Sequence, residues 1–384
     1  MWQKAYWYYN KRHSNCQQPF HLLRWLFYFL FLIPSMAIEK LQIEAFLQLA
    51  KLHPVLDVRS PGEYKHAHIP GAFNLPLFTD EERKVVGTAY KQESREMAIK
   101  IGLDYFGPKM RRMIEEAASL TPNQFQKTVL VHCWRGGMRS AGIAWLLDLY
   151  GFKVYTLAGG YKKFRQYVLE TFMQPYSFKI AGGYTGSGKT EILYELQKQN
   201  QSVIDLEKLA SHKGSAFGSL GMPPQPSQEM FENLLAIALL NFDKSNDIWL
   251  EDESQRIGDL NIPQSLWQTM RNSPVYFLDI PFEERLLHIV EWYGKQDKEK
   301  MINAIIRIKK RLGGLETKTA VNYLIEENTT ESFRVLLKYY DKWYLKGLQA
   351  RGTENKLLIK IDCEKVDASI NTQRLLTIHA ASYA

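Results

Sequence analysis

The sequence predicts an α/β protein in which two domains, each built on a parallel sheet, follow one another along the chain. Three observations support this prediction. Short runs of branched apolar residues recur, as in the buried strands of parallel sheets. Glycine-rich turns and segments with helical spacing follow several of these runs. The chain has 384 residues, of which 45% are hydrophobic and 23% charged, so it is long enough for two or three domains.

The composition restricts the classes of function and partner. A formal net charge of +8 favours a polyanionic partner such as RNA, although a mild excess of Lys and Arg also occurs on ordinary solvated surfaces. Three cysteines are too few and too scattered for a disulfide framework or a four-ligand zinc site. We therefore expect a reduced, cytoplasmic protein.

An apolar run near the N-terminus, Leu22 to Pro34, follows basic residues. It is short for a membrane span, which needs about 20 residues. A second methionine, Met36, lies directly after the run and before the first patterned segment. We expect residues 1–35 to be a non-native extension, with a hydrophobic leader or anchor as the alternative, and we expect no stable membrane association. Cys16 belongs to this segment and receives no role.

The first domain is predicted over residues 36–170, as alternating strands and helices. An amphipathic helix precedes a short strand at Val55–Val58, and the apolar residues around "HIPGAFNLP", residues 68–76, predict a further strand bounded by prolines. "TVLVH", residues 128–132, is typical of a buried parallel strand, and residues 140–151 of a helix that ends at a glycine. Residues 165–177 are expected to form a polar connector to the second domain.

One motif in this half is specific for a family. The pattern Asp-x-Arg, Glu-Tyr, then His-Ile-x-Gly-Ala-x-Asn-x-Pro resembles the rhodanese domain, with Ala67 where the family usually has glycine. The matching residues are Asp57, Arg59, Glu63, Tyr64, His68, Gly71, Ala72, Asn74 and Pro76. We interpret Asp57 and His68 as residues that brace the loop rather than react.

The loop between the strand at 128–132 and the following helix contains Cys133 and two adjacent glycines. Such a loop directs several backbone N–H groups at one point and binds an anion. The same groups, helped by Arg135 and Arg139, should lower the pKa of Cys133 below about 8.5 and make it a nucleophile. The alternative is an inert buried cysteine. The segment also fits His-Cys-x₅-Arg, the signature of cysteine phosphatases, some of which share the rhodanese fold.

The second domain is predicted over residues 171–384, as a P-loop NTPase-like α/β domain with helical additions. An apolar strand leads into "GYTGSGKT", which fits G-x₄-G-K-[ST], and a helical pattern follows at once. In this motif backbone N–H groups surround a phosphate, a lysine reaches its outer oxygens and a threonine ligates Mg²⁺. The phosphate-binding residues would be Gly183, Gly186, Gly188, Lys189 and Thr190.

A carboxylate that completes the site should lie at the end of a neighbouring strand. "DIWLEDES" predicts such a strand with Glu251, Asp252 and Glu253 at its tip, so Thr190 with Glu251 or Asp252 would hold the metal. The segments near residues 275–280 and 357–363 predict two further strands, and Cys363 is interpreted as a core residue.

Two other segments of this half have candidate functions. A Gly- and Pro-rich loop between the P-loop and the acidic strand is either a substrate loop or a solvated connector. Its candidate residues are Asp205, Glu207, His212, Lys213 and Ser215. Residues 305–314 predict one helix with four basic residues, Arg307, Lys309, Lys310 and Arg311, which would form a lid, hold an RNA backbone or remain a solvated face.

The combination of "CWRGGMRS" with "GGYTGSGKT", "DLEKLASHKGSAFG" and "EDESQRIG" resembles the tRNA 2-selenouridine synthase family, from about Met36 to the C-terminus. The resemblance implies replacement of sulfur in wobble 2-thiouridine of tRNA by selenium from selenophosphate, through an S-geranyl intermediate made from geranyl diphosphate. Cys133 would form S-selanylcysteine, with Arg135 and Arg139 holding selenophosphate. A selenophosphate-supplying enzyme would be a second partner, after tRNA.

Two other interpretations of the whole chain stay open at this point. One is a cysteine phosphatase or simple sulfurtransferase fused to a kinase-like P-loop domain. The other is an RNA-binding module in which the P-loop only senses a nucleotide. In the favoured interpretation the P-loop holds the diphosphate of geranyl diphosphate, with Mg²⁺, rather than a nucleotide to be hydrolysed.

Overall fold

The computed structural model describes residues 38–121, 127–243, 245–349 and 357–381. The expectations for residues 1–35, including the hydrophobic leader and Cys16, lie outside the described residues. Within the described ranges, no helix is both long enough and apolar enough to cross a membrane.

The first half of the chain folds as an all-parallel five-stranded sheet in the order β1-β5-β4-β2-β3. Its strands are β1 (Glu39–Leu41), β2 (Val55–Asp57), β3 (Phe73–Asn74), β4 (Thr128–His132) and β5 (Lys153–Leu157). Its helices are α3 (Ile43–Ala50), α4 (Pro61–His66), α5 (Asp80–Gln92), α6 (Arg95–Phe106), η1 (Gly107–Lys109), α7 (Met110–Ser119), α8 (Met138–Leu149) and α9 (Gly160–Thr171). The predicted strand at residues 128–132 is confirmed, and the loop after it starts at the carboxyl edge of the sheet.

The second half contains another parallel five-stranded sheet, in the order β12-β11-β6-β8-β7. Its strands are β6 (Ser177–Gly183), β7 (Ser202–Val203), β8 (Asp247–Glu251), β11 (Val275–Asp279) and β12 (Leu358–Asp362), and β9 (Arg256–Ile257) pairs with β10 (Leu260–Asn261) in a separate hairpin. Its helices are α10 (Lys189–Lys198), α11 (Leu206–Ala210), α12 (Gln228–Leu240), α13 (Gln264–Arg271), α14 (Phe282–Tyr293) and α19 (Ala368–Ala381). The predicted α/β class holds for both halves.

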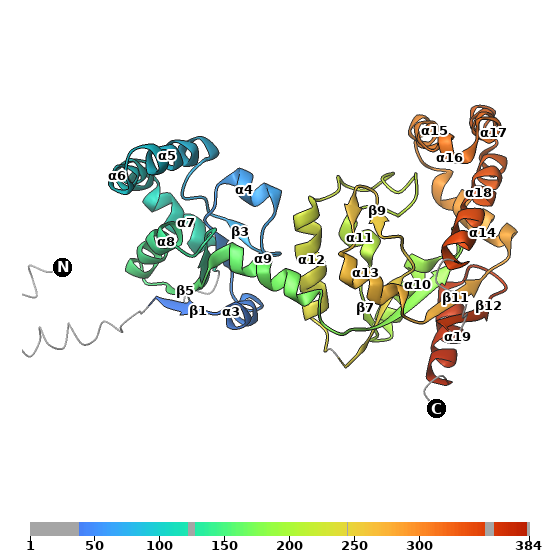
Figure 1. The fold of residues 1–384 in the computed structure, drawn as a ribbon, viewed down its shortest axis with the longest axis horizontal. Coiled ribbons are helices and arrows are strands. Elements are labelled where there is room, and N and C mark those ends of the chain that lie inside the picture. Colours follow the sequence, from blue (N-terminus) through green and yellow to red (C-terminus); the bar gives the residue numbers. More distant parts are fainter. Residues whose placement is uncertain (1–37, 122–126, 244, 350–356, 382–384) are drawn as a thin grey trace, which may run out of the picture.

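Four helices form the predicted helical addition at one end of the molecule (Figure 1). They are α15 (Lys298–Arg307), α16 (Lys309–Leu312), α17 (Gly314–Ile325) and α18 (Thr329–Gln349). The prediction of one helix over residues 305–314 is wrong. Ile308 has φ −93° and ψ 5°, outside the helical region, and it separates α15 from the short α16. The four basic residues are therefore divided between two helices.

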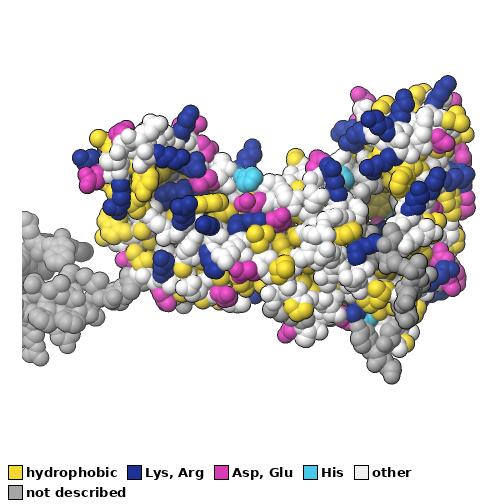
Figure 2. Space-filling model, viewed as in Figure 1, with side chains coloured by type: hydrophobic (Ala, Val, Ile, Leu, Met, Phe, Trp, Pro, Cys, Tyr) yellow, Lys and Arg dark blue, Asp and Glu magenta, His cyan; other side chains and the backbone are white. Residues whose placement is uncertain are grey.

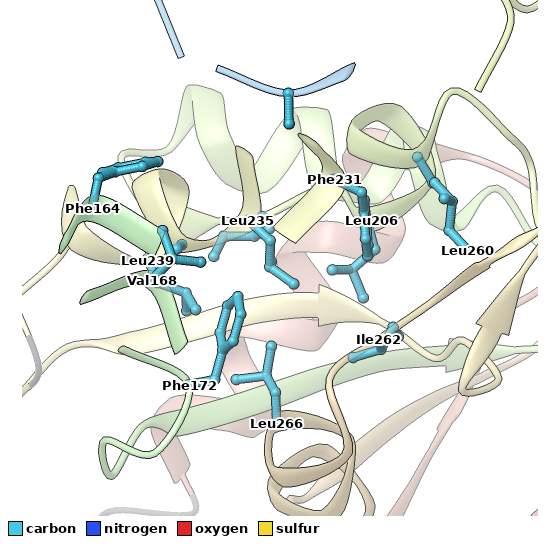
Figure 3. Packing of buried hydrophobic residues seen from close by; sticks show 14 of the residues in the cluster. Phe164, Val168, Phe172, Leu206, Phe231, Leu235, Leu239, Leu260, Ile262 and Leu266 are labelled. Carbon is cyan, nitrogen blue, oxygen red and sulfur yellow. The ribbon is translucent and has the colours of Figure 1, made fainter. Parts of the chain in front are cut away.

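The expected polar connector between the halves is instead largely a packed helix. Residues 165–171 form the C-terminal part of α9, and Phe164, Val168 and Phe172 recur every four residues and are buried. This stripe packs against α12, where Phe231, Leu235 and Leu239 are also buried (Figure 3). Apolar residues four positions apart lie on one face of a helix. The sequence analysis missed this apolar face because polar residues separate its members along the chain.

Polar contacts complete the junction between the two halves. The Asn233 side chain, fully buried on α12, donates to the Tyr161 hydroxyl at 2.8 Å and to the His68 carbonyl at 2.9 Å. The Tyr161 hydroxyl donates to Glu229 at 2.8 Å. Arg165 on α9 forms an ion pair with Glu232 on α12. The halves are thus joined by a common core and by buried hydrogen bonds, so we expect them to move as one body.

Candidate active sites

The Cys133 loop joins β4 to α8 at the carboxyl edge of the first sheet. The backbone N–H of Gly137 donates to the Cys133 sulfur at 3.3 Å, and the Ser140 hydroxyl lies 3.3 Å from the same atom. Gly160 allows this loop to pack closely, since its φ is +59° and a Cβ there would lie 2.4 Å from the Cys133 carbonyl oxygen. The loop is therefore shaped around the sulfur as an anion cradle.

The pKa of Cys133 lies below its ordinary value, as the sequence predicted, and the loop N–H groups contribute as expected, with Ser140 as an additional donor in place of the arginine side chains. Burial alone would raise the pKa of this thiol. Hydrogen bonds from Ser140 and from the backbone N–H groups of Gly137 and Arg135 favour the thiolate and outweigh burial. The side chain of Arg135 is exposed, and Arg139 donates to Glu63 at 2.8 Å. The thiolate is thus stabilised by the loop itself, which leaves Arg135 free to meet an anionic substrate.

A buried layer beneath the loop fixes its position. Arg59 binds Asp57 through two nitrogens, and its guanidinium lies 3.8 Å from the centre of the Tyr161 ring. Burial lowers the pKa of His132 to about 4, so this ring is neutral beside the ion pair at physiological pH. His68 bonds the Tyr64 carbonyl and stacks on the Tyr64 ring. Asp57 and His68 therefore make the bracing contacts that the sequence analysis expected.

The P-loop connects β6 to α10 in the second sheet. Gly186 has φ +84°, and a Cβ there would lie 2.6 Å from Ile289. Gly188 precedes the first residue of α10, so the backbone N–H groups at this helix N-terminus face the loop. The Lys189 ammonium group donates to the Gly183 carbonyl at 3.0 Å, and the Thr190 hydroxyl lies 3.5 Å from Glu207. The predicted phosphate-binding residues therefore converge on one loop.

Residues from the helical addition hold the P-loop in place, and the sequence did not reveal them. Tyr344 on α18 accepts from the Gly183 N–H at 3.0 Å and donates to Asp252 at 2.6 Å. Arg285 is buried and bonds both the Thr185 carbonyl and Asp341 on α18. These contacts span 56 to 161 residues of sequence, so no local motif signals them.

Carboxylates crowd the other side of the P-loop. Burial and the charges of Asp205 and Glu207 raise the pKa of Glu251 well above its ordinary value. Burial and the charges of Glu207 and Glu251 do the same for Glu253. Glu251 accepts the Glu207 N–H at 2.7 Å through one oxygen, and its other oxygen is buried without a hydrogen-bond partner among the described residues. An added cation would therefore relieve repulsion between these groups.

The donor atoms fit Mg²⁺, which prefers carboxylate and hydroxyl oxygens and shares its coordination with phosphate. In the described ranges, no group of three acidic, His or Cys side chains is already arranged to hold a metal ion alone. Such an ion would therefore depend on a bound phosphate group. Glu207, which the sequence analysis assigned to the substrate loop, lies beside Thr190, whereas Asp252, a predicted metal ligand, accepts a hydrogen bond from Tyr344.

Only some of the residues predicted for the substrate loop lie at the P-loop cavity. Glu207, Lys213 and Ser215 line the same cavity of about 380 Å³ as the P-loop, and the Lys213 ammonium group lies 4.1 Å from the centre of the Trp292 ring. Asp205 instead caps α11 through the Lys208 N–H. His212 lines an adjoining basic groove rather than the P-loop cavity.

Aromatic side chains form one wall of the P-loop cavity, and one of them, Tyr344, also contacts the phosphate-binding loop. They are Trp292, Tyr293, Tyr340, Trp343 and Tyr344, from α14 and α18. The spacing of the three α18 residues, with Tyr340 and Tyr344 four positions apart, was the only sequence signal for this wall. A phosphate cradle facing an aromatic wall suits a ligand with an anionic head and an apolar body.

Comparisons with known proteins match both halves of the chain. The rhodanese-like domain family matches residues 42–167, and the family described as tRNA 2-selenouridine synthase AAA domain matches residues 176–376. A tRNA 2-selenouridine synthase of Nitrosomonas europaea is 32% identical over 349 residues, covering 78% of this chain and 90% of the relative. The chain belongs to the tRNA 2-selenouridine synthase family.

A second relative supports the assignment to the tRNA 2-selenouridine synthase family, and a solved structure is similar to part of the chain. The synthase of Hydrogenovibrio crunogenus is 36% identical over 324 residues, which cover 76% of this chain and 88% of the relative. Among solved structures, the N-terminal domain of a Clostridium difficile 630 protein is 41% identical, with a TM-score of 0.31, and covers 35% of this chain and 99% of its own.

Proposed function

We propose that this protein converts wobble 2-thiouridine of tRNA to 2-selenouridine in two steps, each at its own anion cradle. The observation that carries the proposal is the pairing of these cradles in one chain. One surrounds a cysteine with a lowered pKa, and the other faces an aromatic wall and contains no cysteine. Family membership supplies the tRNA substrate and the selenium donor, selenophosphate.

The P-loop cavity performs the first step, geranyl transfer. The loop N–H groups and Lys189 bind the diphosphate of geranyl diphosphate, and the aromatic wall packs against its chain. The thiouridine sulfur attacks the first carbon of the chain, and the carbon–oxygen bond to diphosphate breaks. Thr190 and Glu207 would hold Mg²⁺, which supplies positive charge to the departing diphosphate.

The Cys133 loop performs the second step, in which selenium replaces the S-geranyl group. Its N–H groups and the exposed Arg135 bind the anionic selenium donor, and the Cys133 thiolate lies beside the bound donor. The lowered pKa favours the thiolate form of Cys133 over the thiol, relative to an ordinary cysteine. Ser140 and Gly137 preserve that state through their hydrogen bonds to the sulfur.

Omission of each small substrate tests the proposal. The full chain is incubated with 2-thiouridine-containing tRNA, and the nucleosides are analysed by mass spectrometry. Geranyl diphosphate alone should yield S-geranyl-2-thiouridine, and later addition of selenophosphate should convert it to 2-selenouridine. Formation of 2-selenouridine at full rate without geranyl diphosphate would refute the two-step order. Release of phosphate from aryl phosphates, with no change in tRNA, would favour the phosphatase alternative.

A further inference from the structure

A large apolar cavity that the two proposed steps do not use opens beside the Cys133 loop. It has a volume of about 840 Å³ and lies between α5, α6 and α8. Phe78, Ala98, Leu103 and Trp145 contribute to its walls. Leu103 is 56% exposed and Trp145 is 51% exposed, although both are large and apolar. Exposed apolar side chains gathered around a hollow mark a binding site for an apolar group.

The rim of this cavity is basic. Arg83, Lys84, Lys91 and Arg139 all line it. Glu63 forms ion pairs with Arg83 at 3.0 Å and with Arg139 at 2.8 Å. Lys84 and Lys91 make no ion pair with any residue in the described ranges. Two unpaired ammonium groups at an apolar hollow favour an occupant whose apolar chain is attached to an anionic molecule.

The cavity adjoins the reacting sulfur through the first turn of α8. Met138 and Arg139 line the cavity, and Gly137, the preceding residue, donates its N–H to the Cys133 sulfur. Cys133 also packs in the same apolar cluster as Phe78 and Phe106, which line the cavity. A substrate that reacts at the Cys133 loop would therefore place a neighbouring apolar substituent at the mouth of the cavity.

We infer that this cavity binds the prenyl chain of S-geranylated uridine in tRNA during selenium delivery. The inference rests on the proposed function, and it adds a second prenyl site, in the rhodanese domain. An isoprenoid chain has no hydrogen-bonding groups and matches the apolar walls, while the RNA phosphates match Lys84 and Lys91. The bound prenyl chain would thus orient the modified base over the Cys133 loop, which holds the selenium donor.

The chemistry at this site balances without an oxidant or reductant. Selenophosphate supplies selenium in the −2 state, and the C2–Se bond of the base forms as the C2–S bond breaks. Water cleaves the P–Se bond and gives phosphate. The sulfur leaves with the chain as geranylthiol, after taking a proton from water. The cavity holds the leaving group of this step.

Binding of two RNA probes tests the inference. An anticodon stem-loop RNA with one 2-thiouridine is compared with the same RNA after chemical S-geranylation, by fluorescence anisotropy with the full chain. The wild type should bind the geranylated RNA at least about tenfold more tightly than the RNA with 2-thiouridine, since the geranyl chain moves from water into the apolar cavity. Trp145→Glu and Leu103→Glu place a charge in the cavity at half-exposed positions and should each reduce this preference to about threefold or less.

A matched control lies on the same helix. Leu149 is 70% exposed, belongs to α8 and does not line the cavity, so Leu149→Glu should keep the wild-type preference. Retention of the preference by both Trp145→Glu and Leu103→Glu would overturn the inference. A wild-type dimer in sedimentation that Trp145→Glu dissociates would also overturn it, because the face would then bind a second copy.

The failure of this inference can be distinguished from failure of the proposed function. The geranylated RNA is prepared chemically, so its binding does not require geranyl transfer by the protein. A cavity-dependent preference without any geranyl transfer would refute the first step of the proposed function and support the cavity. Geranyl transfer by a protein that binds both RNAs equally well would support the first step of the proposed function and refute the prenyl site in the cavity.

Discussion

Ser140 is the single residue on which the reactivity of Cys133 depends most directly. Its hydroxyl lies 3.3 Å from the sulfur and is the first of the contacts that lower the pKa of this thiol against the effect of burial. We expect Ser140→Ala to raise the pKa of Cys133, since the variant loses a hydrogen bond that favours the thiolate while the sulfur stays buried. Because a lowered pKa keeps the thiolate populated at lower pH, the alkylation midpoint should move to higher pH in the variant.

Peptide-resolved alkylation with iodoacetamide across pH 5 to 10 measures this midpoint. Cys363 is the internal control, since burial raises the pKa of its thiol to about 11 and it should react slowly in both proteins. Equal midpoints for Cys133 in the wild type and in Ser140→Ala would show that the backbone N–H groups alone stabilise the thiolate.

Single residues were predictable from the sequence where a local motif fixes them. Cys133 and Lys189 each belong to a continuous loop whose spacing defines an anion cradle, so their surroundings follow from neighbouring residues. Tyr344 was not predictable as a P-loop contact, because its partner Gly183 is 161 residues away. Glu207 was predicted as a loop residue, but its contact with Thr190 depends on how α11 packs beside β8.

At the scale of elements, α9 and α12 hold the two halves of the chain together through buried Asn233. Asn233→Ala would leave the His68 carbonyl without this donor and remove one bond to Tyr161. An unsatisfied buried polar group costs about 1–3 kcal/mol, and we expect a loss of this size in the free energy of unfolding. Urea unfolding followed by intrinsic fluorescence would measure it.

The control for this prediction lies on the exposed end of the same helix. Asn241 caps the C-terminus of α12 and is exposed, so Asn241→Ala should change the free energy of unfolding by less than about 0.5 kcal/mol. Equal stability of the two variants would show that the buried hydrogen bonds do not hold the halves together.

Elements with a strong local pattern were predicted well, and those shaped by tertiary packing were not. The strand at residues 128–132 is apolar throughout and was placed correctly. The C-terminal part of α9 was expected to be a polar connector because charged and polar residues separate its buried stripe. The break at Ile308 has no glycine or proline to signal it.

At the scale of the whole molecule, Lys and Arg side chains gather on both sides of a depression between the two halves (Figure 2). The sequence predicted a tRNA contact at Arg307, Lys309, Lys310 and Arg311, of which Arg307 and Arg311 line the basic groove beside the P-loop cavity. Replacing all four with Gln should weaken binding of many tRNAs alike. The log-log salt slope should fall by roughly one unit per lost phosphate contact.

Filter binding of several tRNAs from 50 to 300 mM salt would measure this effect. Arg111→Gln with Arg112→Gln is the control, since these exposed residues are already paired with Glu115 and Glu116 on α7. If the variant with all four substitutions kept the wild-type affinity and salt slope, the four basic residues would be a solvated surface that does not contact tRNA.

The central claim is that the two anion cradles perform different steps, and one measurement tests it most directly. Thiouridine-containing tRNA is incubated with selenophosphate, geranyl diphosphate and either Cys133→Ala or Lys189→Ala, and its nucleosides are quantified by mass spectrometry. Cys133→Ala should accumulate S-geranyl-2-thiouridine, because the P-loop cavity contains no cysteine, whereas Lys189→Ala should leave 2-thiouridine unreacted. Absence of the geranylated nucleoside with Cys133→Ala, or its formation at the wild-type rate with Lys189→Ala, would contradict this division between the sites.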